Sequence, residues 1–242
     1  MTSHSPALSG RSAVVTGASR GIGAGIASAL GAQGVRVVML ARHEAALKAH
    51  SARVPESIPL ACDVADRGSV ARAAGRIATE LGGAPDILVN NAGLFRVSLV
   101  EATTAETFAE ILDTNLVAPF LFVRTFLEEM KRRRSGHIVT IGSIADRTVF
   151  TGNAAYSAAK FGLRALHEVM RAELRGSGVR ATLVSPAATD TDIWKEVTVT
   201  DPAGSPHTER PMLAVQDVVA AVMFALIQPE KVNVDELRLS RT

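Results

Sequence analysis

Short apolar segments recur along the chain and alternate with longer, alanine-rich segments whose apolar residues are spaced as on a helix. Uninterrupted apolar runs are typical of strands buried on both faces, as in a parallel sheet. This alternation predicts an α/β fold, a doubly wound parallel sheet with helices on both faces. The predicted strands are 12–16, 36–40, 58–61, 87–89, 137–141, 180–184 and 232–239, and the predicted helices are 22–33, 43–52, 67–82, 104–134, 154–176 and 214–228.

The pattern continues through the whole chain, which indicates one domain. The 242 residues contain no internal repeat and no Pro/Ser-rich linker, so we expect a single domain over residues 1–242, with residues 1–9 flexible. One irregular insertion, residues 187–211, is rich in proline and polar residues. Long loops in compact domains are usually functional or mobile, and we expect this one to be a substrate loop.

Composition argues against several classes of function. The formal charge is +2 and aromatic residues make up 4%, so nothing suggests a nucleic-acid partner. The one basic run, residues 131–134, is typical of a solvated helix C-terminus. Cys62 is the single cysteine, which leaves no disulfide within the chain and no cysteine metal site. Without a membrane-length apolar run or a signal-peptide pattern, we expect a cytoplasmic protein with no membrane partner and no metal.

A glycine-rich turn follows the first predicted strand and leads directly into a predicted helix. Its glycines have the spacing G-x-x-x-G-x-G within Thr16–Gly23. Such a turn lets the backbone approach a pyrophosphate at the positive N-terminus of the helix, whereas the alternative is a tight turn without a ligand. The candidate cofactor contacts here are Gly17, Ser19, Arg20, Gly21, Ile22 and Gly23.

The end of the second predicted strand indicates which dinucleotide binds. A carboxylate there would bind the ribose 2′-hydroxyl of NAD, whereas an arginine accommodates the 2′-phosphate of NADP. The strand ends at Ala41 and Arg42 with no acid, and Arg20 supplies a second cation. Either arginine alone is typical of a surface residue, but the two together favour NADP. After the third strand, Asp63 and Val64 could bracket the adenine.

The only tyrosine, Tyr156, precedes Lys160 by one helical turn in a run of small residues. A free phenol ionises near pH ~10, so an unaided tyrosine is a poor proton carrier at neutral pH. A lysine ammonium on the same helix face would lower the phenol pKa and make it a usable acid and base. The alternative is an aromatic core residue beside a solvated lysine.

Together with Asn90-Asn91-Ala92-Gly93 after the fourth predicted strand, these motifs resemble the short-chain dehydrogenase/reductase family over nearly the whole chain. The resemblance implies a single Rossmann domain with a seven-stranded parallel sheet. It also implies an assembly, a homotetramer or at least a dimer, built on the long helices 104–134 and 154–176. The catalytic residues that the resemblance implies are Asn115, Ser143, Tyr156 and Lys160.

The resemblance assigns a role to each of these side chains. Tyr156 would be the acid and base, Ser143 would hydrogen-bond the substrate oxygen, and Lys160 would hold the nicotinamide ribose. Asn115 would bind a water that relays protons, although it also fits a residue that kinks its helix.

Further cofactor contacts are implied after the fourth and sixth strands. The chain departs from the family pattern at Ala187, where a glycine is usual, so the turn must avoid positive φ or tolerate strain. The remaining implied cofactor contacts are Asn90, Ala92, Gly93, Tyr156, Lys160, Pro186, Thr189 and Thr191.

These features predict an NADP-dependent oxidoreductase that interconverts a small carbonyl compound with its alcohol or hydroxy acid. The C-terminal segment lacks the glycine pair of 3-oxoacyl reductases and resembles the branch of clavulanic-aldehyde reductase and serine/3-hydroxy acid dehydrogenases. A 3-oxoacyl-(acyl-carrier-protein) reductase and a non-catalytic NADP-binding protein remain as alternatives. Trp194 either packs over the substrate or anchors the loop to the core.

Overall fold

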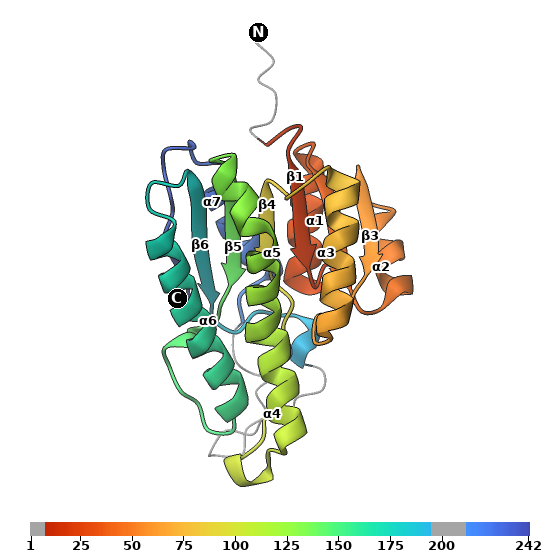
Figure 1. Cartoon of the computed structure of the whole chain (residues 1–242). Coiled ribbons are helices and arrows are strands. Elements are labelled where there is room, and N and C mark those ends of the chain that lie inside the picture. Colours follow the sequence, from red (N-terminus) through yellow and green to blue (C-terminus); the bar gives the residue numbers. More distant parts are fainter. Residues whose placement is uncertain (1–7, 195–211) are drawn as a thin grey trace.

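The computed structural model describes residues 8–194 and 212–242, and its described strands form one parallel sheet in the order β3-β2-β1-β4-β5-β6-β7 (Figure 1). The predicted doubly wound α/β Rossmann fold is therefore confirmed. The strands are β1 Ser12–Thr16, β2 Arg36–Ala41, β3 Ser57–Ala61, β4 Ile87–Asn90, β5 Gly136–Ile141, β6 Val179–Pro186 and β7 Glu236–Leu239. The helices are α1 Gly21–Ala32, α2 Glu44–Ser51, α3 Arg67–Leu81, α4 Ala105–Leu112, α5 Ala118–Arg132, α6 Ala154–Glu173 and α7 Val215–Leu226.

Helices cover both faces of the sheet, and each face has its own apolar core. Leu30 of α1 and Val222 of α7 lie in one buried cluster, which α2 also joins. Ile77 of α3 and Phe122 of α5 lie in the other, which also includes residues of α6. In Figure 1, α3, α5 and α6 lie in front of the sheet and α1 and α7 behind it. Strands buried on both faces explain why the apolar runs are uninterrupted.

The predicted long helix 104–134 is in fact interrupted. A π-helical segment, Asp113–Val117, separates α4 from α5, and Pro119 lies in the first turn of α5. Proline has no N–H to donate to the preceding turn, so the regular ladder cannot pass through it unchanged. The apolar spacing on both sides is helical, which is why the pattern alone did not reveal the break.

The last predicted strand is shorter than expected, because β7 spans Glu236–Leu239 and not 232–239. Before it, the Asn233 side chain accepts a bond from the Ala181 N–H and donates to the Ala181 carbonyl, both at 3.0 Å. A side-chain amide thus replaces the backbone pairing that a longer strand would make.

The two segments expected to be mobile lie largely outside the described residues. Of the expected flexible start, residues 1–9, Leu8 is buried in the core, and the neighbouring Gly10 N–H bonds the Gly34 carbonyl. Of the expected substrate loop, residues 195–211 lie outside the described part of the chain.

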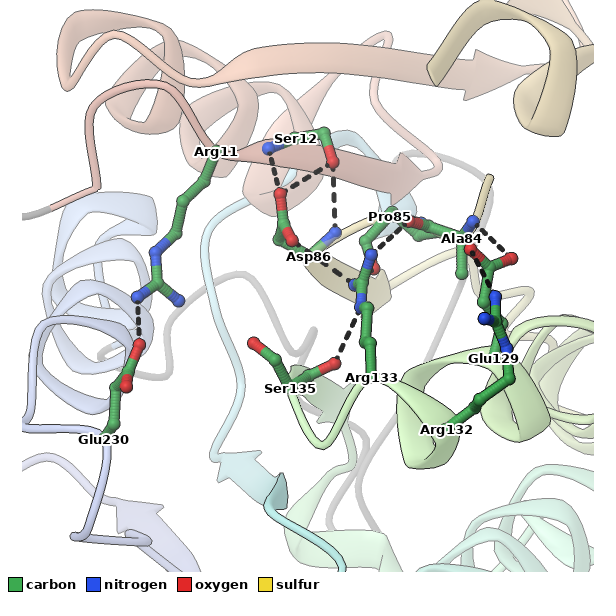
Figure 2. A network of polar contacts seen from close by, with 10 residues as sticks. All are labelled: Arg11, Ser12, Ala84, Pro85, Asp86, Glu129, Arg132, Arg133, Ser135 and Glu230. Carbon is green, nitrogen blue, oxygen red and sulfur yellow. Dashed lines mark hydrogen bonds and ion pairs between the residues drawn. The ribbon is translucent and has the colours of Figure 1, made fainter. Parts of the chain in front are cut away.

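A polar network joins β1, β4 and α5 at the edge of the sheet where the strands begin (Figure 2). Asp86 accepts bonds from the Ser12 backbone and hydroxyl at 2.8 and 2.9 Å, and it pairs with Arg133 at 3.3 Å. Arg133 also donates to the carbonyls of Ala84, Pro85 and Ser135. The expectation of a fully solvated basic run is therefore wrong at Arg133, whose guanidinium is committed to neighbouring backbone.

We expect Arg133→Met to lower the free energy of unfolding by about 2–3 kcal/mol, because carbonyls that now accept bonds from a charged donor would lose them. Arg132→Met is the matched control, since the Arg132 side chain is 77% exposed. It should change stability by no more than about 0.5 kcal/mol. Urea unfolding of both variants measures the difference, and equal midpoints would contradict the assignment.

Two buried histidines make stability depend on pH. His137 of β5 is buried with its Nε2 atom 2.8 Å from the Thr182 hydroxyl oxygen. Burial, and then the positive charge of Arg180, lowers the pKa of His137 to about 3. Burial likewise lowers the pKa of His167 to about 4. Both rings are therefore neutral in the folded protein at pH values where the unfolded chain binds a proton.

Stability should consequently rise with pH between about 3 and 6.5 and be lost as the solution is acidified, because there the unfolded chain binds more protons. His137→Gln should make the rise of stability with pH less steep. A smaller rise should remain in this variant, because His167 is still present. His43→Gln, at an exposed position, should leave the slope unchanged. Urea unfolding at several pH values tests this, and an unchanged slope in His137→Gln would refute the role of that ring.

Candidate functional site

A cavity of about 370 Å³ opens where the carboxyl ends of the strands meet. β1 lies between β2 and β4, so the chain order of the strands reverses there, and ligands of such sheets bind at this point. The Thr16 hydroxyl, at the end of β1, joins β1 to the end of β4 and the segment after it. It accepts bonds from the N–H groups of Asn91 and Ala92 at 2.9 and 3.0 Å and donates to the Val89 carbonyl.

The glycine turn has a shape that other residues would not allow. Gly17 and Gly21 have φ of +67° and +57°, and a Cβ at Gly17 would lie 2.9 Å from the Ala92 Cα. α1 then begins without a side-chain cap, as α2 and α6 do, and it alone of these follows the glycine turn directly. Uncapped N–H groups at a helix N-terminus that lines a cavity suit an anionic phosphate. These residues fit a dinucleotide.

Arg20 and Arg42, expected to recognise a 2′-phosphate, both line this cavity. Arg42 directly follows β2 and is exposed. The Arg20 guanidinium lies 4.0 Å from the Asp192 carboxylate, with both side chains partly exposed. Both arginines thus line one cavity, and the Arg20 guanidinium faces the Asp192 carboxylate there.

Most of the residues expected to contact a cofactor line the cavity, and three of the predicted site residues do not. The predicted residues that line it are Gly17, Ser19, Arg20, Gly21, Ile22, Arg42, Asp63, Val64, Ala92, Gly93, Ser143, Tyr156, Lys160, Pro186, Thr189 and Thr191. The three that do not are Gly23, Asn90 and Asn115.

Each of these three residues is next in sequence to a residue that lines the cavity. A Cβ at Gly23 would lie 2.3 Å from the Gly17 carbonyl oxygen, so this glycine allows close packing of the turn. Asn90 is buried within the sheet at 3% exposure. Asn115 donates to the carbonyls of Leu94 and Ile111 at 2.8 and 2.9 Å. Its amide therefore holds the π-helical segment, which agrees with the helix-distorting alternative.

Ser143, Tyr156 and Lys160 meet at the inner end of the cavity. Ser143 follows β5, and its hydroxyl accepts a bond from the Ala145 N–H at 3.1 Å. Tyr156 is half-buried on α6. Lys160, one turn later and 4% exposed, donates to the Ile141 carbonyl at 2.9 Å, and its Nζ lies 5.6 Å from the Tyr156 ring centroid. The three side chains expected to carry catalysis therefore lie together.

The electrostatics of the phenol differ from the sequence-based expectation. Burial raises the pKa of Tyr156 to about 12, and the Ser143 hydroxyl acts in the opposite direction. Burial also lowers the pKa of Lys160 to about 8. The expected lowering of the phenol pKa by Lys160 is thus wrong for this structure, because burial dominates and the negative charge of Asp146 also raises the pKa. Tyr156 therefore carries its proton at neutral pH.

A buried acid beneath the site escaped sequence analysis. The Asp146 carboxylate, in the turn after Ser143, accepts bonds from the Ser185 hydroxyl at 2.5 Å and from Arg147 at 2.7 Å. Arg147 also pairs with Glu236 of β7. The negative charge of Asp146 raises the pKa of Lys160 and so opposes the effect of burial. Nothing in its sequence context distinguishes Asp146 from a surface acid.

Comparison with known proteins identifies the family. The family model described as "short chain dehydrogenase" matches residues 11–202. The chain belongs to the short-chain dehydrogenase/reductase family.

Relatives of known structure and name agree with this assignment. A metagenomic short-chain oxidoreductase solved in complex with NADP is 31% identical, with a TM-score of 0.83 over 98% of this chain and 100% of that one. Farnesol dehydrogenase of Aedes aegypti is 35% identical over 95% of both chains. Glycine betaine reductase ATRR of Emericella nidulans is also 35% identical over 95% of this chain, which spans only 18% of that protein.

The departure from the family pattern at Ala187 costs no backbone strain. In the described residues, positive φ outside glycine occurs at Glu56 and Arg134 and not at Ala187. The Ala187 N–H instead donates to the Leu239 carbonyl at 2.8 Å and so continues the pairing of β6 with β7. Of the two outcomes that the sequence allowed, the turn avoids positive φ.

Within residues 8–194 and 212–242, no helix is long and apolar enough to cross a membrane.

Proposed function

We propose that this short-chain dehydrogenase/reductase is an NADP(H)-dependent enzyme that interconverts a carbonyl compound with its alcohol, with Tyr156 as acid and base. The observation that carries the proposal is the meeting of Ser143, Tyr156 and Lys160 in one cavity with the uncapped N-terminus of α1. A phosphate-binding end and a proton-donating end then share a single space, as a hydride-transfer enzyme requires.

Each polar side chain at the catalytic end of the cavity has its own proposed role. NADP, when bound, supplies or accepts the hydride. In reduction, Tyr156 gives its proton to the substrate oxygen while the Ser143 hydroxyl donates a bond that stabilises the developing negative charge. Lys160, fixed by the Ile141 carbonyl, carries positive charge near the phenol. Asn115 holds the backbone of Leu94 and Ile111, and it would also bind the water that links Lys160 to solvent.

Arg20 and Arg42 support NADP as the cofactor. Both line the cavity and could bind a 2′-phosphate there, and a relative of known structure is described as a complex with NADP. Gly17, Gly21 and Ile22 would hold the pyrophosphate, Asp63 and Val64 the adenine, and Pro186, Thr189 and Thr191 the nicotinamide. Asn90 and Gly23 would act by shaping these contacts.

The proposal is tested by incubating the purified protein with NADPH and a panel of short aldehydes and ketones, and following the loss of NADPH absorbance. Turnover of one or more carbonyls supports it. Binding of NADPH without turnover of any of them would favour a non-catalytic NADP-binding protein.

We also propose a cytoplasmic homotetramer. Phe120 of α5 and Phe161 of α6 are 44% and 41% exposed, and burial of such side chains between copies would stabilise an assembly. Light scattering at micromolar concentration should show a mass well above the 25.4 kDa of one chain. The double variant Phe120→Glu with Phe161→Glu should lower that mass. A wild-type protein of single-chain mass would contradict the assembly.

A further inference from the structure

Aromatic side chains, scarce in the chain as a whole, gather at the catalytic end of the cavity. Phe95, Phe150, Tyr156 and Trp194 all line it, although the chain has only eight phenylalanines, one tryptophan and one tyrosine. Apolar side chains complete this end of the cavity, namely Leu94, Val97, Ile144, Ile193 and Met212.

Three of the rings form a continuous wall. Phe95 packs edge-to-face on Tyr156, with centroids 4.8 Å apart, and on Trp194, with centroids 5.1 Å apart. The Trp194 indole N–H donates to the Thr189 carbonyl at 2.9 Å. Its only polar atom is thus satisfied by backbone, and the rest of the indole is an apolar surface. The wall runs from the catalytic phenol to the 3-10 helix Asp192–Trp194.

Positive charge in the described part of this cavity lies elsewhere or is already committed. Arg42 follows β2, and Arg20 lies in the glycine turn, where its guanidinium is 4.0 Å from the Asp192 carboxylate. Lys160 donates to the Ile141 carbonyl. A substrate carboxylate at the aromatic wall would be desolvated against apolar side chains, which is costly without a cation.

Resting on the proposed function, we infer that the substrate is a neutral carbonyl compound carrying an apolar, planar substituent, an aryl or conjugated alkenyl group, which packs on the Phe95–Trp194 wall. Planar unsaturated groups gain edge-to-face contacts with such rings in addition to the burial of their apolar surface. This replaces the hydroxy acid suggested by the C-terminal sequence. Phe95 also has a second role: its ring packs on the Tyr156 ring and so positions the catalytic phenol.

Three ketones with one skeleton separate these possibilities. Butan-2-one, 4-phenylbutan-2-one and 4-oxopentanoate differ only in carrying hydrogen, phenyl or carboxylate at the same carbon. With NADPH, we expect kcat/KM for the phenyl compound to exceed that for each of the others roughly 100-fold, from burial of one ring. A value for 4-oxopentanoate equal to or above that for 4-phenylbutan-2-one would overturn the inference.

Substitutions in the Phe95–Trp194 wall test whether it causes the preference for the phenyl ketone. Trp194→Leu should lower the ratio of phenyl compound to butan-2-one about tenfold, and Trp194→Phe should restore most of it. Phe95→Leu should in addition lower kcat for every ketone, since Phe95 contacts Tyr156. Phe224→Leu, at a 51% exposed position on α7, should keep the wild-type ratio. A ratio unchanged in Trp194→Leu would also overturn the inference.

Because Trp194 is the only tryptophan, its fluorescence reports binding independently of turnover. A saturable change with 4-phenylbutan-2-one and none with 4-oxopentanoate supports the wall as an aryl site. That result without turnover of any carbonyl would count against the proposed reaction and not against the ligand preference. Turnover of short aldehydes with no preference among the ketones would count against the preference alone.

Discussion

Tyr156→Phe should lower turnover of carbonyl substrates by at least about 100-fold, the scale of general acid–base catalysis. The substitution keeps the ring and its packing on Phe95 but removes the proton that Tyr156 would give to the substrate oxygen. Cofactor affinity should change little. The measurement is steady-state turnover with NADPH, together with a direct titration of the cofactor.

The pH dependence of the wild-type enzyme sharpens this prediction. With burial raising its pKa to about 12, Tyr156 is protonated throughout the neutral range, so reduction should persist there and decline as pH rises toward that value. Oxidation of the alcohol needs the phenolate and should accelerate as pH rises. Near wild-type turnover in Tyr156→Phe would eliminate the proposed acid.

The wild-type enzyme should prefer NADPH over NADH by roughly 10- to 100-fold in kcat/KM, and the double change Ala41→Asp with Arg42→Ile should invert the preference. A charge-assisted bond from an arginine to the 2′-phosphate is worth about 1.5–3 kcal/mol, and each factor of ten corresponds to about 1.4 kcal/mol. The new aspartate would repel the phosphate and accept bonds from the ribose hydroxyls of NADH.

Arg36→Ile is the matched control for this experiment. Arg36 starts the same strand at its other end and lies outside the cavity lining, so its loss should leave the cofactor ratio unchanged. Equal kcat/KM for NADPH and NADH in the unmodified protein would mean that Arg20 and Arg42 face solvent and select nothing.

The sequence predicted those parts of the fold that depend on local pattern. Continuous apolar runs located the strands, because the sheet is buried on both faces, and the run at Ser12–Thr16 has the bounds of β1. The sequence pattern did not predict interactions between segments that are distant in sequence. The pairing of Asn233 with Ala181 and the π-helical segment held by Asn115 depend on partners far away in sequence or on one side-chain bond.

The same division applies to the candidate site. Motifs with fixed spacing, such as the glycine turn and the Tyr156–Lys160 pair, predicted residues that the structure brings into one cavity. The electrostatic balance was not predictable, because the pKa of Tyr156 depends on how deeply the fold buries it. The aromatic wall was missed as well, since Phe95 and Trp194 lie far apart in sequence and meet only in three dimensions.

The network around Asp86 and Arg133 lies where the strands begin, and the cavity lies where they end. Substitutions of residues that line the cavity therefore leave the hydrogen bonds and ion pair of this network unchanged. Substitutions of wall residues such as Trp194 should therefore change substrate preference while leaving this network intact. This separation makes the scaffold tolerant of functional divergence, and it recommends Arg133 and its partners as positions to leave untouched when specificity is redesigned.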